Sequence, residues 1–299
     1  MKPLFIALLS LGWLGISLLG HADDFREKIV KEFTPTQGPG ATTLAIFNTN
    51  GFVRVEGYSG SKVIVEVEKS LSADNAEILA QGKQEFKLLF EQTGDSILAY
   101  IGEPFCSFHE RDGKKNTRRG SCSNWDCCGN YPRIEYHYNL DFTVKVPYAT
   151  NLYLSTVNQG DVTVKDVTGT LRTFNVNGPI TLTNAKGAAE VSTINGNVAA
   201  NYAASPPGNS SYYTLNGDIT IDYPATLSAD LQFKNTNGDF YTDFPNTEVL
   251  PMQVTKNQEG RGDGTVYKIN KAASVRIGRG GNTLRLETFN GNIYVKKQN

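Results

Sequence analysis

The 299-residue chain is short of the residue types that catalytic sites most often use. It holds only three histidines, and just two of them, His109 and His137, lie beyond residue 22. Any Ser-His-Asp arrangement would have to use one of these two. The chain has no Gly-x-Ser-x-Gly motif, no Gly-Lys-Ser/Thr phosphate loop and no His-Glu-x-x-His helix. We therefore predict a protein that is not an enzyme and that has no catalytic residues, cofactor or metal ion.

An excess of positive charge is also missing, because 29 Lys and Arg face 30 Asp and Glu, for a formal net charge of −1. Nucleic-acid binding proteins need a concentrated positive surface to displace counterions from phosphates. The charge balance therefore argues against nucleic acid as a partner. Beyond residue 22 no apolar run is long enough to cross a bilayer, so we expect no transmembrane segment there.

Residues 1–22 have the pattern of a secretory signal peptide. Lys2 precedes a long apolar stretch, which ends at Gly20-His21-Ala22. We predict cleavage after Ala22, and hence export to the periplasm or the cell surface. The alternative is a retained membrane anchor, because Leu4 to Leu19 approaches the length that spans a bilayer. No cysteine follows the stretch, so a lipoprotein anchor is not expected.

Cysteine is confined to one short region, a predicted insert over residues 103–135. Its four members are Cys106, Cys122, Cys127 and Cys128. In an exported protein this pattern favours two disulfides that hold together a long loop poor in apolar residues. A zinc site that includes His109 is an alternative, but the spacing is not that of a regular zinc finger. Free thiols are the third interpretation.

The same insert is rich in basic residues. Arg118 and Arg119 lie close to Trp125 in the sequence, a combination that could bind an anionic glycan or a lipid headgroup. A basic run of this kind is more often an ordinary solvated loop.

Asn-Gly and its variants recur through the chain at a nearly fixed step. From Gly160 through Gly178, Gly196 and Gly217 to Gly238 the steps are 18, 18, 21 and 21 residues. A fixed step of this size is typical of a solenoid, in which each repeat is one coil stacked on the last. A β-sandwich with Asn-Gly hairpins is the alternative, but hairpins do not require one recurring pattern.

Apolar and polar residues alternate after each corner glycine. This alternation predicts one set of side chains that points into the core: Val162, Val164, Ile180, Leu182, Ile219, Ile221, Ile293 and Val295. It predicts a second set that points outward: Thr163, Thr181, Thr220 and Tyr294. Stacked asparagines at matching corners are expected to hydrogen-bond along the axis. We therefore predict an all-β fold, a single β-solenoid of 18–21-residue coils over residues 136–299, continuous with the N-terminal part.

The region from 23 to 102 is expected to cap this solenoid with strands and one short helix. The stretch "SADNAEILAQGKQEF" predicts the helix, with Asp74 and Glu77 as a capping box. Ile78, Leu79 and Phe86 would then cover the first coil, since an open end exposes unpaired backbone groups.

Several of these segments resemble a family of strand-repeat proteins known as putative adhesins, a domain family of largely unassigned function. The resemblance is carried by "VRVEG" at 53–57, "VPYATNLYLSTVNQGDVTV" at 146–164, "FNVNGPI" at 174–180 and "STINGNV" at 192–198. It covers most of residues 41–295 and implies an architecture rather than a chemistry. One departure is Gln159, which separates Asn158 from Gly160 and is expected to shift that corner by one residue.

We therefore expect an adhesin-like binding or scaffold protein of the cell envelope, with an envelope glycan or protein as its partner. Its predicted binding face includes Thr163, Thr181, Thr220, Tyr241 and Tyr294. One alternative is a carbohydrate-cleaving β-helix enzyme that uses Asp218 and Asp239 on adjacent coils. Another is a structural or signalling accessory of the envelope that binds no ligand.

Overall fold

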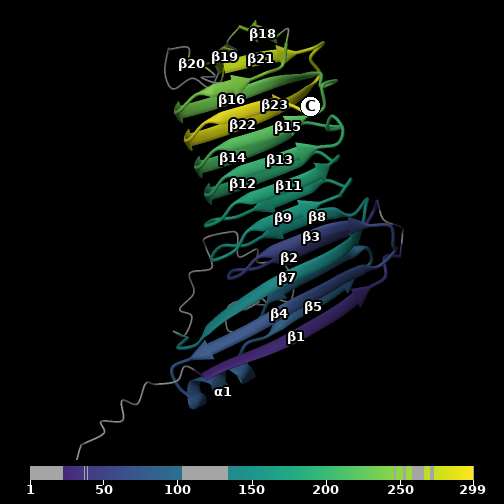
Figure 1. Cartoon of the computed structure of the whole chain (residues 1–299), viewed down its shortest axis with the longest axis vertical. Helices are drawn as coiled ribbons and strands as arrows, with labels where there is room; N and C mark the ends of the chain where they lie inside the picture. The colour runs from purple at the N-terminus through teal and green to yellow at the C-terminus, as the bar shows by residue number, and fades with distance from the viewer. Residues whose placement is uncertain are drawn as a thin grey trace, which may run out of the picture.

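The computed structural model describes residues 23–36, 38, 40–102, 134–245, 247–251, 254–257, 266–269 and 273–298. Two large sheets face each other around one elongated core (Figure 1). The predicted all-β class and the short helix are therefore confirmed. The predicted signal peptide and all four cysteines lie outside the described residues.

Sheet A has ten strands. Their order is β1 (Asp23–Phe33), β4 (Val63–Ala73), β7 (His137–Pro147), β3 (Val53–Tyr58), β9 (Val162–Lys165), β11 (Ile180–Ala185), β13 (Val198–Tyr202), β15 (Ile219–Tyr223), β23 (Ile293–Lys297) and β17 (Phe240–Thr242).

Sheet B has eleven strands. Their order is β18 (Thr247–Leu250), β21 (Ala273–Ile277), β16 (Ala229–Asn237), β22 (Asn282–Asn290), β14 (Ser210–Asn216), β12 (Ala189–Asn195), β10 (Leu171–Phe174), β8 (Asn151–Ser155), β2 (Thr43–Phe47), β6 (Ser96–Ile101) and β5 (Leu88–Thr93). Strands β19 (Val254–Asn257) and β20 (Val266–Ile269) form a separate antiparallel pair.

The prediction of a single solenoid is wrong, because both sheets are mixed. The middle strands pair in parallel, as β9, β11, β13 and β15 do in sheet A. At one end β1, β4 and β7 pair antiparallel, and so do β5 and β6. At the other end β21 pairs antiparallel with both β16 and β18. Each end of the molecule is therefore closed by strand pairing that a stack of identical coils does not contain.

The layers are also out of chain order. Strand β22 pairs in parallel with β14 on one side and with β16 on the other, and β23 lies likewise between β15 and β17. In Figure 1 the yellow strands β22 and β23 accordingly lie among green ones. Along the chain, β16 and β17 of the outermost parallel layer come before β21, and β22 and β23 come after it. Strands β22 and β23 nevertheless lie one layer further in than β16 and β17.

The predicted inward side chains form the core between the sheets. All eight of them, from Val162 to Val295, are at most 1% exposed. They continue a single cluster that also takes in Val53 and Val55 of β3 and Leu140 and Phe142 of β7. The period-two alternation of sequence therefore places the core correctly even though the predicted topology does not hold.

The corners of the layers share the pattern Thr/Asn-x-Asn-Gly, and their asparagines form one hydrogen-bonded file. From the second asparagine on, each side-chain Nδ2 donates to the Oδ1 of the preceding layer, for example Asn195 to Asn177 at 2.9 Å and Asn216 to Asn195 at 2.8 Å. The complete file runs Asn50, Asn158, Asn177, Asn195, Asn216, Asn290 and Asn237. The predicted stacking of corner amides is confirmed.

A second contact at each corner joins a buried side chain to a glycine carbonyl. The hydroxyl of Thr193 donates to the carbonyl of Gly178 at 2.9 Å, and that of Thr214 donates to Gly196 at 2.8 Å. The glycines themselves leave no room for a side chain, since a Cβ on Gly217 would lie 2.2 Å from the carbonyl oxygen of Gly196. Gly217 also has a φ of +151°, which residues with a side chain rarely adopt.

Gln159 does not break this file. It takes the left-handed conformation, with a φ of +57°, and is exposed. Asn158 keeps its place in the asparagine file, and Gly160 keeps its place against the carbonyl of Gly51. The extra residue is therefore accommodated locally, and the expected one-residue shift of the corner does not spread to neighbouring layers.

Helix α1 (Ala76–Glu85) packs beside β4 and β1 at the lower end of Figure 1. Its N-cap is Asn75, whose side chain accepts a hydrogen bond from the backbone N–H of Ile78 at 2.9 Å. The predicted capping box of Asp74 and Glu77 is therefore wrong, because the N-cap lies one residue later and Ile78, not an acidic residue, occupies the N3 position. Leu79 and Phe86 are buried in the common core, and Ile78 packs against it.

Three tyrosines form a polar cluster inside the core. The hydroxyl of Tyr212 donates to Tyr202 at 2.6 Å and lies 3.1 Å from that of Tyr223. All three side chains are at most 1% exposed. Burial, above all, raises the pKa of each hydroxyl well above its usual value of 10.0.

We predict that these tyrosines make the fold sensitive to alkali. A raised pKa in the folded state means that the unfolded chain releases protons which the folded protein retains. The stabilisation is fully present below pH 10 and is lost as the pH rises from there toward the folded-state pKa. Above pH 10 the unfolding free energy of the wild type should fall as the pH rises. In Tyr212→Phe this fall should be less steep, by roughly 1 kcal/mol per pH unit. Denaturant titrations across this range test it, with exposed Tyr148→Phe as the control; equal slopes in the two variants would contradict it.

A second prediction compares two buried threonines. The hydroxyl of Thr173 has no hydrogen-bond partner within the described part of the chain, whereas that of Thr193 donates to Gly178. Thr173→Val should raise the unfolding free energy by about 1 kcal/mol, and Thr193→Val should lower it by about 1–2 kcal/mol. Thermal and denaturant unfolding of both variants is the measurement. If both changes had the same sign, the proposed difference between the two sites would be refuted.

Candidate functional site

The outward residues of sheet A form a straight row across the strands. Each lies three positions after its corner glycine, and the strand register places them side by side. We call this the Thr/Tyr row: Arg54, Thr163, Thr181, Ala199, Thr220, Tyr294 and Tyr241. Every predicted binding residue of the described region therefore belongs to one continuous surface, at a strand spacing of about 4.8 Å.

The row ends in two stacked aromatic rings. The ring centroids of Tyr241 and Tyr294 are 5.1 Å apart, and their planes differ by 11°. Tyr241 lies on the three-residue edge strand β17 and is 48% exposed. Its hydroxyl donates to Asp239 at 3.2 Å, and that carboxylate raises the pKa of Tyr241 above 10.0. Lys296 lies over the ring of Tyr294, 5.2 Å from its centroid.

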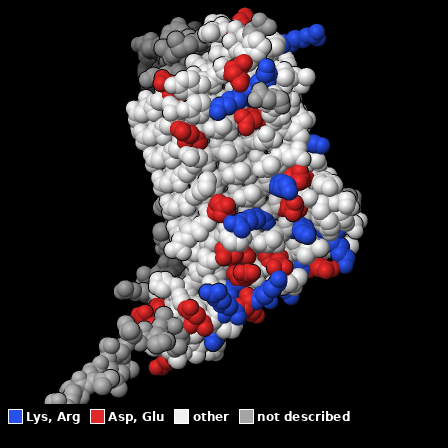
Figure 2. Space-filling view, viewed as in Figure 1, with Lys and Arg blue, Asp and Glu red and all other residues white. Residues whose placement is uncertain are grey.

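Charge is unevenly distributed along the stack. On the face shown in Figure 2, charged side chains gather over the lower end, where Figure 1 places β1 and β4. Several of them are paired across these strands, such as Lys28 with Glu66 at 2.6 Å and Lys62 with Glu32 at 2.7 Å. The middle layers on this face carry few charges. The lower end therefore resembles a solvated edge, and the middle layers offer mainly neutral polar groups.

The pairing of Asp218 with Asp239 on adjacent coils is wrong. Asn292 lies between them, because β22 and β23 are inserted there. The carboxylate of Asp218 accepts a hydrogen bond from the backbone N–H of Asn292 at 2.7 Å, and the Asn292 amide oxygen accepts one from Asp239 N–H at 2.9 Å. One layer therefore lies between the two carboxylates, which places them two strand spacings, or about 10 Å, apart. They are too far apart to share a proton, and the carboxylate of Asp218 stabilises a corner.

The other predicted site residues lie outside the described part of the chain. These are Arg118, Arg119 and Trp125, together with the four predicted disulfide cysteines. Among the described residues, no group of three or more His, Cys, Asp or Glu side chains is placed to hold a metal ion. Nor do those residues contain a helix long and apolar enough to cross a membrane.

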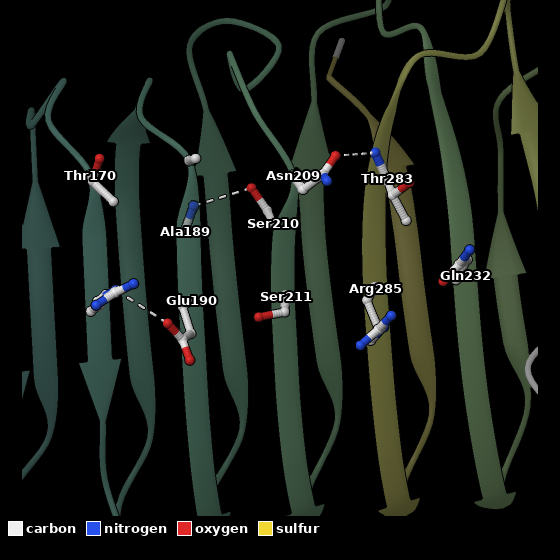
Figure 3. Close-up of a pocket in the computed structure, with 11 residues that line it drawn as sticks. Thr170, Ala189, Glu190, Asn209, Ser210, Ser211, Gln232, Thr283 and Arg285 are labelled. Carbon is white, nitrogen blue, oxygen red and sulfur yellow. Dashed lines mark hydrogen bonds and ion pairs between the residues drawn. The ribbon is translucent and has the colours of Figure 1, made fainter. Parts of the chain in front are cut away.

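A second surface, on sheet B, was not predicted from the sequence. It is an open trough of about 450 Å³ that crosses five parallel strands (Figure 3). Five of its lining residues share one offset, six positions before the corner glycine of their layer: Arg172, Glu190, Ser211, Arg285 and Gln232. That constant offset is the sequence signal that would have identified it.

Comparison with known proteins shows distant structural similarity. No family model and no curated protein matches the chain. A putative cell adhesion protein from Clostridium sporogenes is 11% identical with a TM-score of 0.45, over 92% of this chain and 100% of that chain. A putative adhesin from Bacteroides fragilis is 11% identical with a TM-score of 0.36, over 91% and 97%. A putative lipid binding protein from Parabacteroides distasonis is 9% identical with a TM-score of 0.28, also over 91% and 97%.

Two of these three structures bear the description of the family that the sequence resembles. Their identity to this chain is low, and the matches confirm neither the family nor its repeat type.

We predict that Asp218 has a structural role that an amide can replace. Asn197 and Asn292 occupy the same position in the flanking layers, and each accepts a backbone hydrogen bond with its amide oxygen. Asp218→Asn should therefore change the unfolding free energy by less than about 0.5 kcal/mol, whereas Asp218→Ala should lower it by about 1 kcal/mol. Denaturant unfolding of the two variants tests this. A loss of stability in Asp218→Asn as large as in Asp218→Ala would show that the charge itself is required.

Proposed function

We propose that the protein is an exported, non-enzymatic binding protein of the cell envelope, and that the Thr/Tyr row contacts an envelope glycan or protein. The observation that supports this most directly is the end of the row, where two stacked tyrosines stand beside a line of threonine hydroxyls. Export is proposed from the pattern of residues 1–22 alone.

The chemistry of the row suits adhesion to a polar polymer. Tyrosine offers an apolar face together with a hydroxyl, at a low cost in side-chain entropy. Thr163, Thr181 and Thr220 add hydroxyl groups that both donate and accept hydrogen bonds. Because all of them lie on rigid paired strands, little order has to be imposed when a ligand binds.

The carboxylates do not suit catalysis by the predicted arrangement. Asp218 is held by a backbone hydrogen bond, Asp239 accepts the hydroxyl of Tyr241, and a full layer separates them. An accessory protein without a ligand remains the second candidate. The regular, well-paired interior would serve that role equally well, so the exposed tyrosine pair is what distinguishes the two.

The test is loss of binding when the tyrosine pair is removed. The double variant Tyr241→Ala, Tyr294→Ala should bind glycan arrays and isolated cell envelopes at least about tenfold more weakly than the wild type. Tyr148→Ala is the matched control, because Tyr148 is 46% exposed but lies outside the row. Equal binding by the double variant and the wild type would remove the row from the site. Failure of the wild type to retain any envelope polymer or protein would favour the accessory role.

A further inference from the structure

We propose that the trough on sheet B is a second binding site, one that takes a carboxylate-bearing saccharide and holds its carboxylate with Arg285. This inference extends the proposed binding function to the opposite outer face of the molecule and names a ligand class for that face. It rests on side chains that the Thr/Tyr row does not use.

The trough is built by strand register. Arg172 of β10 lies opposite Glu190 of β12, Glu190 opposite Ser211 of β14, and Ser211 opposite Arg285 of β22. Gln232 of β16 lies opposite Arg285 on the other side of β22. Five different strands therefore present one side chain each along a single line. A pyranose unit is similar in length to the strand spacing of about 4.8 Å, so a linear saccharide can follow this line.

The rim of the trough is fixed by hydrogen bonds to backbone N–H groups (Figure 3). The amide oxygen of Asn209 accepts from Thr283 at 2.8 Å, and the hydroxyl oxygen of Ser210 accepts from Ala189 at 3.1 Å. Inside this rim, the side chains of Ser211 and Gln232 make no hydrogen bond with other described residues. They offer a hydroxyl and an amide, the groups that sugar hydroxyls pair with.

Arg285 is the unpaired charge of the trough. Glu190 is engaged by Arg172 at 3.3 Å, and Glu287, two residues along β22, is engaged by Lys234. No acidic side chain in the described ranges forms an ion pair with Arg285. The trough therefore has two guanidinium groups and one carboxylate, an excess of one positive charge. A planar guanidinium binds a carboxylate through two parallel hydrogen bonds.

An aromatic group lies next to the polar line and favours a sugar over a small inorganic anion. Tyr153 of β8 is the neighbour of Arg172 in the same row. Its ring lies 5.2 Å from that of Phe47 and 5.4 Å from that of Phe174, and all three are half-buried on the outer face. Sugars combine apolar ring faces with polar edges, so they match an aromatic surface beside hydroxyl, amide and guanidinium groups.

The experiment compares acidic and neutral oligosaccharides on the full exported chain. Oligogalacturonate, oligoalginate and hyaluronan fragments are titrated by calorimetry at low ionic strength, beside methyl-esterified oligogalacturonate, in which the carboxylates are neutral. We expect at least one acidic saccharide to bind. Methyl esterification, or Arg285→Gln, should weaken that binding at least about tenfold. Arg26→Gln, an exposed arginine on β1, should bind like the wild type.

The proposal would be overturned by a failure of all three acidic saccharides to bind, by equal binding of the methyl ester, or by unchanged binding to the Arg285→Gln variant. Competition by inorganic phosphate as strong as that by free galacturonate would also overturn it, by reducing the site to a simple anion site. The Tyr241→Ala, Tyr294→Ala variant separates this inference from the proposed function, because it should retain the acidic saccharide while losing the ligand of the Thr/Tyr row.

Discussion

A file of asparagine side chains holds the layers of this protein in register. From Asn158 to Asn237 every side-chain amide donates in the same direction, to the side-chain amide oxygen of the layer before it, and Asn50 at the start of the file donates to the backbone carbonyl of Tyr138. Buried Thr or Asn side chains hold the corner carbonyls beside this file, as Thr214 holds that of Gly196. Where the corner carries glycine, the next layer approaches so closely that a Cβ has no room. The contacts at this one corner thus set the spacing of the layers and the register of the strands that precede and follow it.

The strand register that the corners specify determines which side chains line up on the outer faces of both sheets. A slip by one residue would turn Thr163 inward and Val162 outward, and it would break the amide file as well. Residues at equal distance from the corner must therefore line up across the strands. Three positions after the glycine they form the Thr/Tyr row, and six positions before it they form the trough on sheet B. Both candidate surfaces follow from the same corner.

The sequence was sufficient for whatever depends on a single layer. Alternation placed Ile180 and Leu182 in the core and Thr181 outside, and the recurring Asn-Gly predicted the amide file. The order in which similar layers stack was not predictable. The corners at Gly238 and Gly291 have the same Asn-Gly sequence, so either corner could pack next to that of Gly217. The antiparallel return through β21, in a stretch without the repeat, decides in favour of Gly291.

The same limit applies to the ends and to the candidate sites. Asp74 and Asn75 are both good N-cap residues, and a helix boundary one residue away costs little, so the sequence does not distinguish them. The Asp218 and Asp239 pairing failed because it assumed that layers follow chain order. The trough on sheet B was not predicted because its members are a mixture of basic, acidic and neutral polar residues, such as Arg172, Glu190 and Ser211. Only their common offset from the glycine relates them.

The out-of-order layer matters most for the two surfaces. Had the layers followed the chain, β22 and β23 would have ended the stack, and Arg285 and Tyr294 would have had a neighbour on one side only. Insertion places Arg285 between Ser211 and Gln232, and Tyr294 between Thr220 and Tyr241. Arg285 and Tyr294 therefore lie inside their rows and have a polar neighbour on each side, so a ligand bound to either one can also contact both of its neighbours. The edge is left to β17, a strand of three residues, which offers little backbone for unwanted pairing.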